Sequence, residues 1–154
     1  MSKKILSRLI KGAKTDYKKV AEILKMKPHR ANDYDEKENG NSYLHDAIEK
    51  GEYGLAKLLL DSGADPNARN SIGHTPLHFA IIFKDIELVE LLIKNNANVN
   101  ARSNSGKTPL HLLTLQKESE ITIKIAELLL KNYASMSIRD AGGFTPLDYL
   151  NSTR

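Results

Sequence analysis

The stretch GHTPLHFAI, residues 73–81, decides the fold because the chain contains four versions of it. The other three are GNSYLHDAI at 40–48, GKTPLHLLT at 106–114 and GFTPLDYLN at 143–151. Their first glycines are 33, 33 and 37 residues apart. A period of this length is typical of a protein built from stacked repeats. The last spacing is longer by four residues, and the excess falls within 116–122.

Each repeat is predicted to hold two helices. Thr75 and Thr108 are suited to cap the first helix of a repeat, and Pro76 and Pro109 occupy the first helical position, where a missing N–H costs nothing. A second apolar segment follows, with the i, i+3, i+4 spacing that places three side chains on one helix face. These triplets are Leu55/Leu58/Leu59, Leu88/Leu91/Leu92 and Ile125/Leu128/Leu129.

The residue that ends the second helix differs between repeats. Gly63 suits the left-handed conformation that closes many helices, and Asn96 tolerates it. The equivalent position in the third repeat is Tyr133, a poor choice for that conformation. We expect local strain or a changed turn there.

The pattern continues toward both ends of the chain. The spacing of Leu6/Leu9/Ile10 and Val20/Ile23/Leu24 predicts a helical pair within 3–26 that caps the stack. At the other end, TPLDYL at 145–150 supplies only the first helix of a fourth repeat. Terminal repeats that depart from the pattern are expected in a stack, because one face of each must meet water.

These features together resemble one family. With TPLH at 75–78 and 108–111, LLLDSGADPNARN at 58–70 and ELLIKNNANVNAR at 90–102, the chain resembles the ankyrin repeat family over 40–150, and less closely over 3–39. It departs from the family pattern at Tyr43, Tyr133 and Asp148 and in the insertion at 116–122. The resemblance implies an all-α ankyrin-repeat solenoid, in which helix-turn-helix units stack and are joined by extended hairpin-like loops.

The same resemblance implies the domain organisation. We expect a single ankyrin-repeat domain, 1–154, with a capping helical pair and linker at 3–39. Full repeats would occupy 40–72, 73–105 and 106–142, and a truncated capping repeat 143–154.

The sequence gives no sign of catalysis. GKT at 106–108 matches the end of a phosphate-binding P-loop, but the first glycine of that motif would fall at Ala101, and the preceding LVELLIKNN reads as an amphipathic helix. The absence of cysteine excludes thiol nucleophiles and Cys-based zinc sites. No Ser–His–Asp order, paired carboxylates or nucleotide fingerprint is present. We therefore expect no enzyme, no cofactor and no small-molecule substrate.

His45, His78 and His111 recur once per repeat. Stacked helices lie about 8–10 Å apart, whereas zinc ligands must lie within about 2.1 Å of the metal. These histidines therefore cannot share one metal ion. In ankyrin-like repeats this histidine joins a helix start to a neighbouring loop, and we expect that role here.

The formal net charge of +4 is unevenly distributed. Residues 1–30 hold ten Lys or Arg and two Asp or Glu, whereas the chain from 39 onward holds twelve basic and thirteen acidic residues. The basic segment is interpreted as the polar face of a capping helix pair; the alternative is contact with nucleic-acid phosphates. That alternative involves Lys3, Lys4, Arg8, Lys11, Lys14, Lys18, Lys19, Lys25 and Lys27.

No apolar run is long enough to span a bilayer. Arg8 and Lys11 interrupt the N-terminal apolar run before a signal peptide's h-region is complete. An amphipathic presequence is the alternative for this segment. We expect a monomeric cytoplasmic protein without membrane insertion; a secreted effector acting in a host cytoplasm is the alternative location.

The resemblance also implies where a partner would bind, namely the concave surface lined by loop tips and first helices. The positions that vary there are Glu38, Asn39, Asn41, Glu49, Lys50, Ser71, Ile72, His74, Ile82, Phe83, Asn104, Ser105, Lys107, Leu115, Gln116, Ala141 and Phe144.

Five of these positions are apolar where the scaffold does not demand it: Ile72, Ile82, Phe83, Leu115 and Phe144. We expect them to form an exposed patch, with Phe83 as anchor and a polar rim of Lys50, His74 and Gln116. Glu49 and Lys107 are also expected to bind the partner. The alternative is that Ile82 and Phe83 complete the core. The expected function is binding of a protein partner without catalysis; the alternatives are an accessory or inhibitory subunit or effector that regulates an enzyme, and the nucleic-acid association described above.

Overall fold

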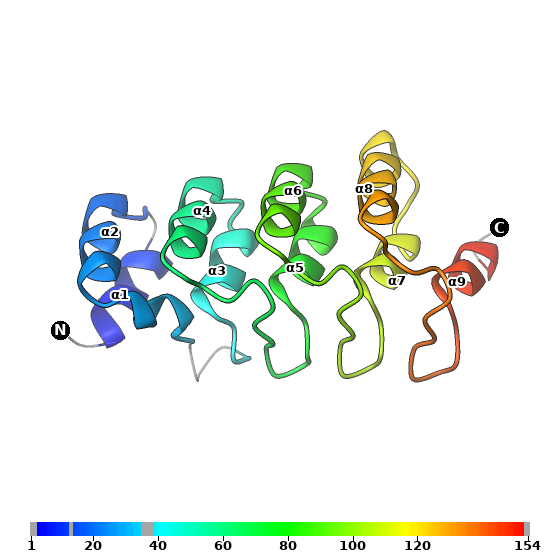
Figure 1. Ribbon diagram of the computed structural model, residues 1–154, viewed down its shortest axis with the longest axis horizontal. Helices are drawn as coiled ribbons and strands as arrows, with labels where there is room; N and C mark the ends of the chain where they lie inside the picture. Colours follow the sequence, from blue (N-terminus) through cyan, green and yellow to red (C-terminus); the bar gives the residue numbers. More distant parts are fainter. Residues whose placement is uncertain (1–2, 13, 35–38, 153–154) are drawn as a thin grey trace.

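Short helices form two rows with a set of loops along one side (Figure 1). The computed structural model describes residues 3–12, 14–34 and 39–152. Its helices are α1 (Lys3–Lys11), α2 (Tyr17–Met26), the 3-10 helix η1 (Pro28–Asn32), α3 (Tyr43–Glu49), α4 (Tyr53–Asp61), α5 (Pro76–Phe83), α6 (Ile86–Lys94), α7 (Pro109–Thr114), α8 (Glu120–Lys131) and α9 (Pro146–Ser152).

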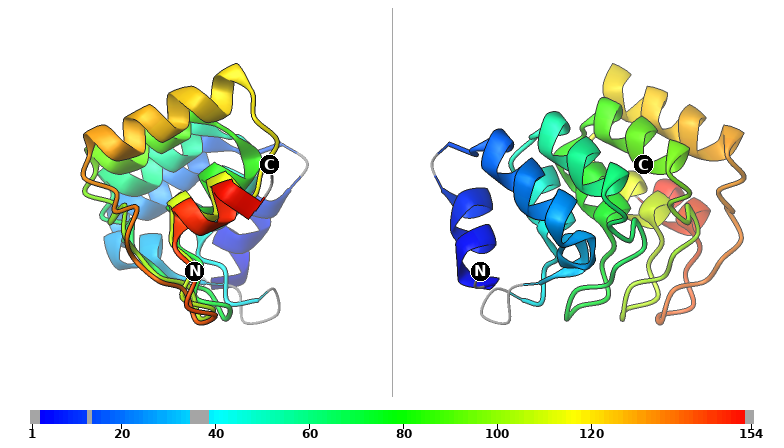
Figure 2. Two further views of the ribbon diagram at one scale, coloured as in Figure 1. Left: turned by 90° about the vertical axis from the view of Figure 1, so that its right-hand side faces the viewer. Right: turned by 60° about the vertical axis from the view of Figure 1, so that its left-hand side comes forward.

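The helices α1, α3, α5, α7 and α9 form the inner row, and α2, α4, α6 and α8 the outer row (Figures 1 and 2). Each central inner helix packs against its outer partner and against its inner neighbours, as α5 does against α6, α3 and α7. Extended loops run from α4 to α5, from α6 to α7 and from α8 to α9. Within the described residues the only β-type pairing is one isolated bridge, between Tyr34 and Ser42. The expected all-α repeat solenoid is confirmed.

The core lies between the two rows. Leu77 of α5 and Leu88 and Leu92 of α6 are fully buried, and their counterparts in the neighbouring repeats are equally enclosed. Near the N-terminus, Leu6 of α1 and Val20 of α2 are buried in the same continuous core, so these two helices pack onto the stack. Burial of these apolar side chains is the main force that holds one repeat against the next.

A histidine ladder joins the repeats. The backbone N–H of Thr75 donates to Nδ1 of His78 at 3.1 Å, and Nε2 of His78 lies 3.1 Å from the carbonyl oxygen of Lys107 in the next repeat. Because a backbone N–H can only donate, Nδ1 accepts, and the proton on Nε2 is donated to the carbonyl. His45 and His111 make the same pair of bonds. The expected structural role of these histidines is confirmed, and no group of three or more metal-ligating side chains occurs in the described part of the chain.

An asparagine ladder runs along the loops as well. Nδ2 of Asn67 donates to the carbonyl of Asn96 at 3.1 Å, and its Oδ1 accepts from the N–H of Asn98 at 2.7 Å. Asn32 and Asn100 bridge their following repeats in the same way. Each amide thus satisfies one donor and one acceptor at the turn that ends the next outer helix.

Tyr133 keeps the turn of its counterparts instead of changing it. Its φ is 67°, close to the 65° of Asn96, and its side chain is 88% exposed. A non-glycine residue in this left-handed region is strained. The expectation of strain is therefore confirmed, and that of a changed turn is not.

The four-residue insertion lengthens α8. This helix has twelve residues, whereas α4 and α6 have nine each. Ser119 caps it, with its side chain accepting from the N–H of Thr122 at 3.3 Å. The insertion therefore becomes most of an extra turn at the N-terminal end of α8, where the helix rises above its neighbours in Figure 1.

The N-terminal pair is fixed to the first repeat by polar contacts. Nζ of Lys50 donates to the carbonyl of Ile10 at 2.8 Å, and the hydroxyl of Thr15 donates to the carboxylate of Glu52 at 2.7 Å. The lysine lies at the carbonyl end of α1, where a cation complements the helix dipole. None of the described helices is both long enough and apolar enough to cross a membrane.

Candidate binding face

The five apolar side chains expected to form a patch are all exposed. Their exposed fractions are 53% for Ile72, 42% for Ile82, 48% for Phe83, 49% for Leu115 and 54% for Phe144. The alternative that Ile82 and Phe83 complete the core is wrong, because both side chains are exposed, whereas the preceding Ala80 and Ile81 are fully buried.

The predicted site residues fall into two groups. The helix-end group lies at the C-terminal ends of α3, α5 and α7 and consists of Glu49, Lys50, Ile82, Phe83, Leu115 and Gln116. The loop group lies just before the inner helices and consists of Ile72, His74, Lys107 and Phe144. Since α5 has eight residues, about 12 Å of helix separates the two groups.

Phe79 connects the two groups. Its ring centroid lies 6.3 Å from that of His74 in the loop group and 6.3 Å from that of Phe83 in the helix-end group. It also packs edge-on against His45 at 5.1 Å. We call His74, Phe79 and Phe83 the aromatic line. Sequence analysis missed Phe79, although its position four residues before Phe83 places both rings on one face of a helix.

The ring of His74 is held in place by the ring of His78. The two rings stack, with centroids 5.0 Å apart and an interplanar angle of 3°. Burial lowers the pKa of His74 below its usual value. The start of the aromatic line is therefore an uncharged ring near neutral pH, suited to contact an apolar partner.

Three of the polar side chains expected to bind a partner form hydrogen bonds within the chain instead. Nζ of Lys50 bonds the end of α1, as described above, and Nε2 of Gln116 donates to the carbonyl of Ile81 at 2.8 Å. The ammonium of Lys107 bonds Asp140 at 2.8 Å and also the hydroxyl of Tyr149. These side chains fix the inner helices relative to one another. Glu49 remains exposed to solvent.

Lys107, Asp140 and Tyr149 form a cluster that lowers the pKa of the aspartate. Hydrogen bonds from Lys107 and Tyr149 hold the pKa of Asp140 well below its usual range. Nζ of Lys107 also lies 4.3 Å from the centroid of the Tyr149 ring, a cation–π contact. This cluster ties α9 to the loop of the preceding repeat.

Of the other variable positions, Glu38 lies outside the described residues, and Asn41 is buried and accepts a hydrogen bond from Asn70 at 2.9 Å. The remaining ones are all exposed, namely Asn39, Ser71, Asn104, Ser105 and Ala141.

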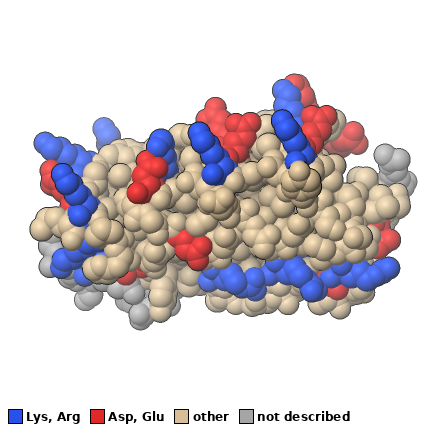
Figure 3. Space-filling view, in the orientation of Figure 1, with Lys and Arg blue, Asp and Glu red and all other residues tan. Residues whose placement is uncertain are grey.

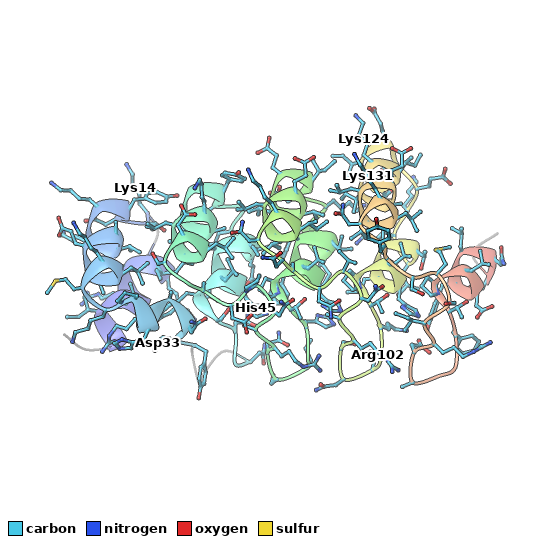
Figure 4. The ribbon with its side chains drawn as sticks, viewed as in Figure 1. Lys14, Asp33, His45, Arg102, Lys124 and Lys131 are labelled. Atoms are coloured by element: carbon cyan, nitrogen blue, oxygen red, sulfur yellow. The ribbon has the colours of Figure 1, made fainter. Side chains whose placement is uncertain are left out.

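The basic residues of the N-terminal segment are dispersed over α1 and α2. Lys19 pairs with Asp16 at 3.1 Å and Lys11 with Asp46 at 3.7 Å. Lys14 projects into solvent (Figure 4), and the side chains of Lys3 and Lys4 lie outside the described ones. The hydroxyl of Tyr17 donates to Glu52 at 3.3 Å. The exposed lysines of α2 lie opposite its buried apolar residues, as in the polar face of a capping helix.

Two family models match the chain. One, described as ankyrin repeats (many copies), matches residues 44–93, and another, described as ankyrin repeats (3 copies), matches residues 69–140. A search of curated proteins found no match. The matched ranges together contain the aromatic line and most residues of both groups.

Proposed function

We propose a function from one premise: the chain belongs to the ankyrin repeat family, whose members generally mediate protein–protein interaction. The proposed function is reversible, non-catalytic recognition of a protein partner. The partner's apolar element would lie along the concave side of the inner helices, against the aromatic line and the exposed side chains of Ile82 and Leu115.

The exposure of Ile82 and Phe83 is the observation that carries this proposal. Apolar side chains that stand together in water usually mark an interaction surface. The ring of Phe83 contacts that of Phe79, which contacts that of His74, so a partner would bind against three adjacent aromatic rings. Aromatic side chains held in place in this way bind at a low cost in conformational entropy.

The test is affinity capture of the partner with purified wild-type protein and with Ile82→Asp/Phe83→Asp. A matched control carries Met26→Asp/Ile121→Asp, because these two side chains are exposed apolar residues of outer helices. Circular dichroism would check that both variants remain folded. We expect wild type and control to retain the same protein and the aspartate variant to lose it.

A measured affinity makes the prediction quantitative. Once the partner is identified, Phe83→Ala should weaken binding by about 2 kcal/mol, as for an anchor residue. Isothermal titration calorimetry would give this value. A folded aspartate variant that holds the partner as tightly as wild type would exclude this face.

Two alternatives differ in mechanism. In the first, the partner is an enzyme and the chain acts as its accessory or inhibitory subunit or as an effector; an activity assay of the captured partner with and without the chain would show this. In the second, the N-terminal lysines bind nucleic acid, and binding to a long polyanion would fall steeply with salt.

A cytoplasmic location and a monomeric state stay predictions.

A further inference from the structure

Three arginines recur at one position of successive loops. Arg69, Arg102 and Arg139 are spaced by the repeat length and are all exposed. We call them the arginine stripe. Figure 3 shows Lys and Arg side chains in a row over the loops on the lower edge of the molecule, and Figure 4 shows Arg102 in the loop below α7.

The stripe has no carboxylate partner of its own. Among the described residues none of the three guanidinium groups forms an ion pair. Arg139 lies near enough to Asp148 to contribute to the lowering of its pKa, but that carboxylate accepts its hydrogen bonds from Thr145. The neighbouring Asp140 is neutralised by Lys107. The positive charge of the stripe is therefore available to an external anion.

The guanidinium groups of Arg69 and Arg102 are held in place by the next loop, and that of Arg139 by its own loop. Arg69 donates to the carbonyl of Arg102 and, at 3.2 Å, to the side-chain oxygen of Asn104. Arg102 in turn donates to the carbonyl of Arg139 at 2.9 Å, and Arg139 donates to the carbonyl of Gly143 at 2.6 Å. An arginine has five N–H donors, so each of these groups keeps several for a ligand. Fixed groups lose little conformational entropy on binding.

We propose that the arginine stripe binds an extended acidic segment of a protein, with carboxylates at every third residue. Stacked repeats place equivalent groups about 10 Å apart. An extended chain in the polyproline II conformation has three residues per turn and rises about 3.1 Å per residue, so every third side chain lies on the same face, about 9 Å from the last. The flat guanidinium group matches a carboxylate with two parallel hydrogen bonds. This surface is separate from the aromatic line and adds a second contact to the proposed function.

The charge distribution favours an acidic peptide over nucleic acid. From residue 39 onward the chain holds thirteen acidic and twelve basic residues, so the stripe is a narrow cationic line on a nearly neutral body. Proteins that bind nucleic acid through the backbone use a broad basic surface. A short peptide needs only the line itself.

The test measures binding of fluorescent peptides by anisotropy at low and at physiological salt. One peptide carries glutamate at every third position, a second carries the same three glutamates side by side, and a third has glutamine in their place. The protein variants are Arg69→Gln/Arg102→Gln/Arg139→Gln and, as a control of equal charge change, Lys25→Gln/Lys94→Gln/Lys131→Gln. These three lysines are exposed on the outer helices α2, α6 and α8.

We expect the spaced peptide to bind best and the arginine variant to lose at least about tenfold in affinity, since each exposed charge pair contributes about threefold. The lysine control should stay within about twofold, and the glutamine peptide should not bind. Single Arg→Gln variants, each weaker by about threefold, replace the triple variant if circular dichroism shows that it is unfolded.

Three results would overturn the proposal: equal binding by the arginine variant, equal binding of the peptide with adjacent glutamates, or preference for a single-stranded oligonucleotide over the spaced peptide. Ile82→Asp/Phe83→Asp should bind the spaced peptide normally. Failure of the stripe is thereby distinguished from failure of the aromatic line.

Discussion

Tyr133 occupies a backbone conformation that favours glycine. Its φ is 67° and its side chain is 88% exposed. We expect Tyr133→Gly to raise the free energy of unfolding by roughly 0.5–1 kcal/mol, because relief of left-handed strain exceeds the added entropy of the unfolded chain. The shift of the urea midpoint, at an unchanged denaturant slope, measures this. Asn96→Gly is the control and should gain less, because asparagine tolerates the same conformation. An unchanged or lowered midpoint for Tyr133→Gly would contradict the strain.

At the same scale, the sequence predicted the burial of individual side chains better than their hydrogen-bond partners. The periodicity predicted most of the buried residues, although Leu58 and Leu128 are only half-buried. Tyr133 was identified as strained from its residue type. The partners of Lys50, Lys107 and Gln116 were not predictable, because each depends on which atoms of another repeat lie within reach of a long side chain. Phe79 was missed because a half-buried aromatic residue on an inner helix has the same pattern as a core residue.

The capped inner helices are the elements most sensitive to pH. Burial lowers the pKa of His45 and of His78 to about 4, against 6.5 for an ordinary histidine. Below pH 6.5 the unfolded chain binds protons that the folded chain does not, so stability falls as pH falls toward 4. Above pH 6.5 both states are neutral and this contribution is complete. Each of the two histidines should lower the free energy of unfolding by about 1.5 kcal/mol between pH 6.5 and 5.

Urea unfolding at several pH values between 7 and 5, at constant ionic strength, checks this expectation. His78→Gln should be less stable at pH 7, because the ladder bonds are altered, but should lose stability with pH less steeply by the contribution of one histidine. A wild-type free energy of unfolding that stays constant over this range would mean that burial does not keep these rings neutral in the folded chain.

The elements themselves followed from the sequence to different degrees. The helical pairs of the repeats were predicted from the triplet spacing, since a helix must place its apolar residues on one face. The insertion was located correctly within 116–122, but its conformation was not predicted. Whether four extra residues lengthen a loop or a helix depends on two conditions. One is the N-terminal cap that Ser119 provides. The other is free space beyond the outer row of helices, which is a property of the assembled stack.

At the scale of the whole molecule the two ends of the stack differ. The N-terminal pair buries Leu6 and Ile10 almost completely, and Lys50 fixes the end of α1. The C-terminal α9 exposes 47% of Leu147 and 37% of Leu150, and its one buried residue is Pro146. A stack of repeats opens most readily where the interface between neighbours is smallest.

Native-state hydrogen exchange should therefore show an asymmetric gradient. We expect the amides of α5 to exchange most slowly, because this helix packs between α3 and α7 under α6. Amides of α1 should be intermediate and those of α9 fastest. Exchange followed by mass spectrometry on peptides from each helix measures this order. Tyr149→Phe, which removes the hydroxyl that bonds Asp140, should speed exchange in α9 and leave α1 unchanged. Equal protection in α9 and α5 would show instead that the stack opens as one unit. The contacts among Lys107, Asp140 and Tyr149 would then couple α9 fully to the core.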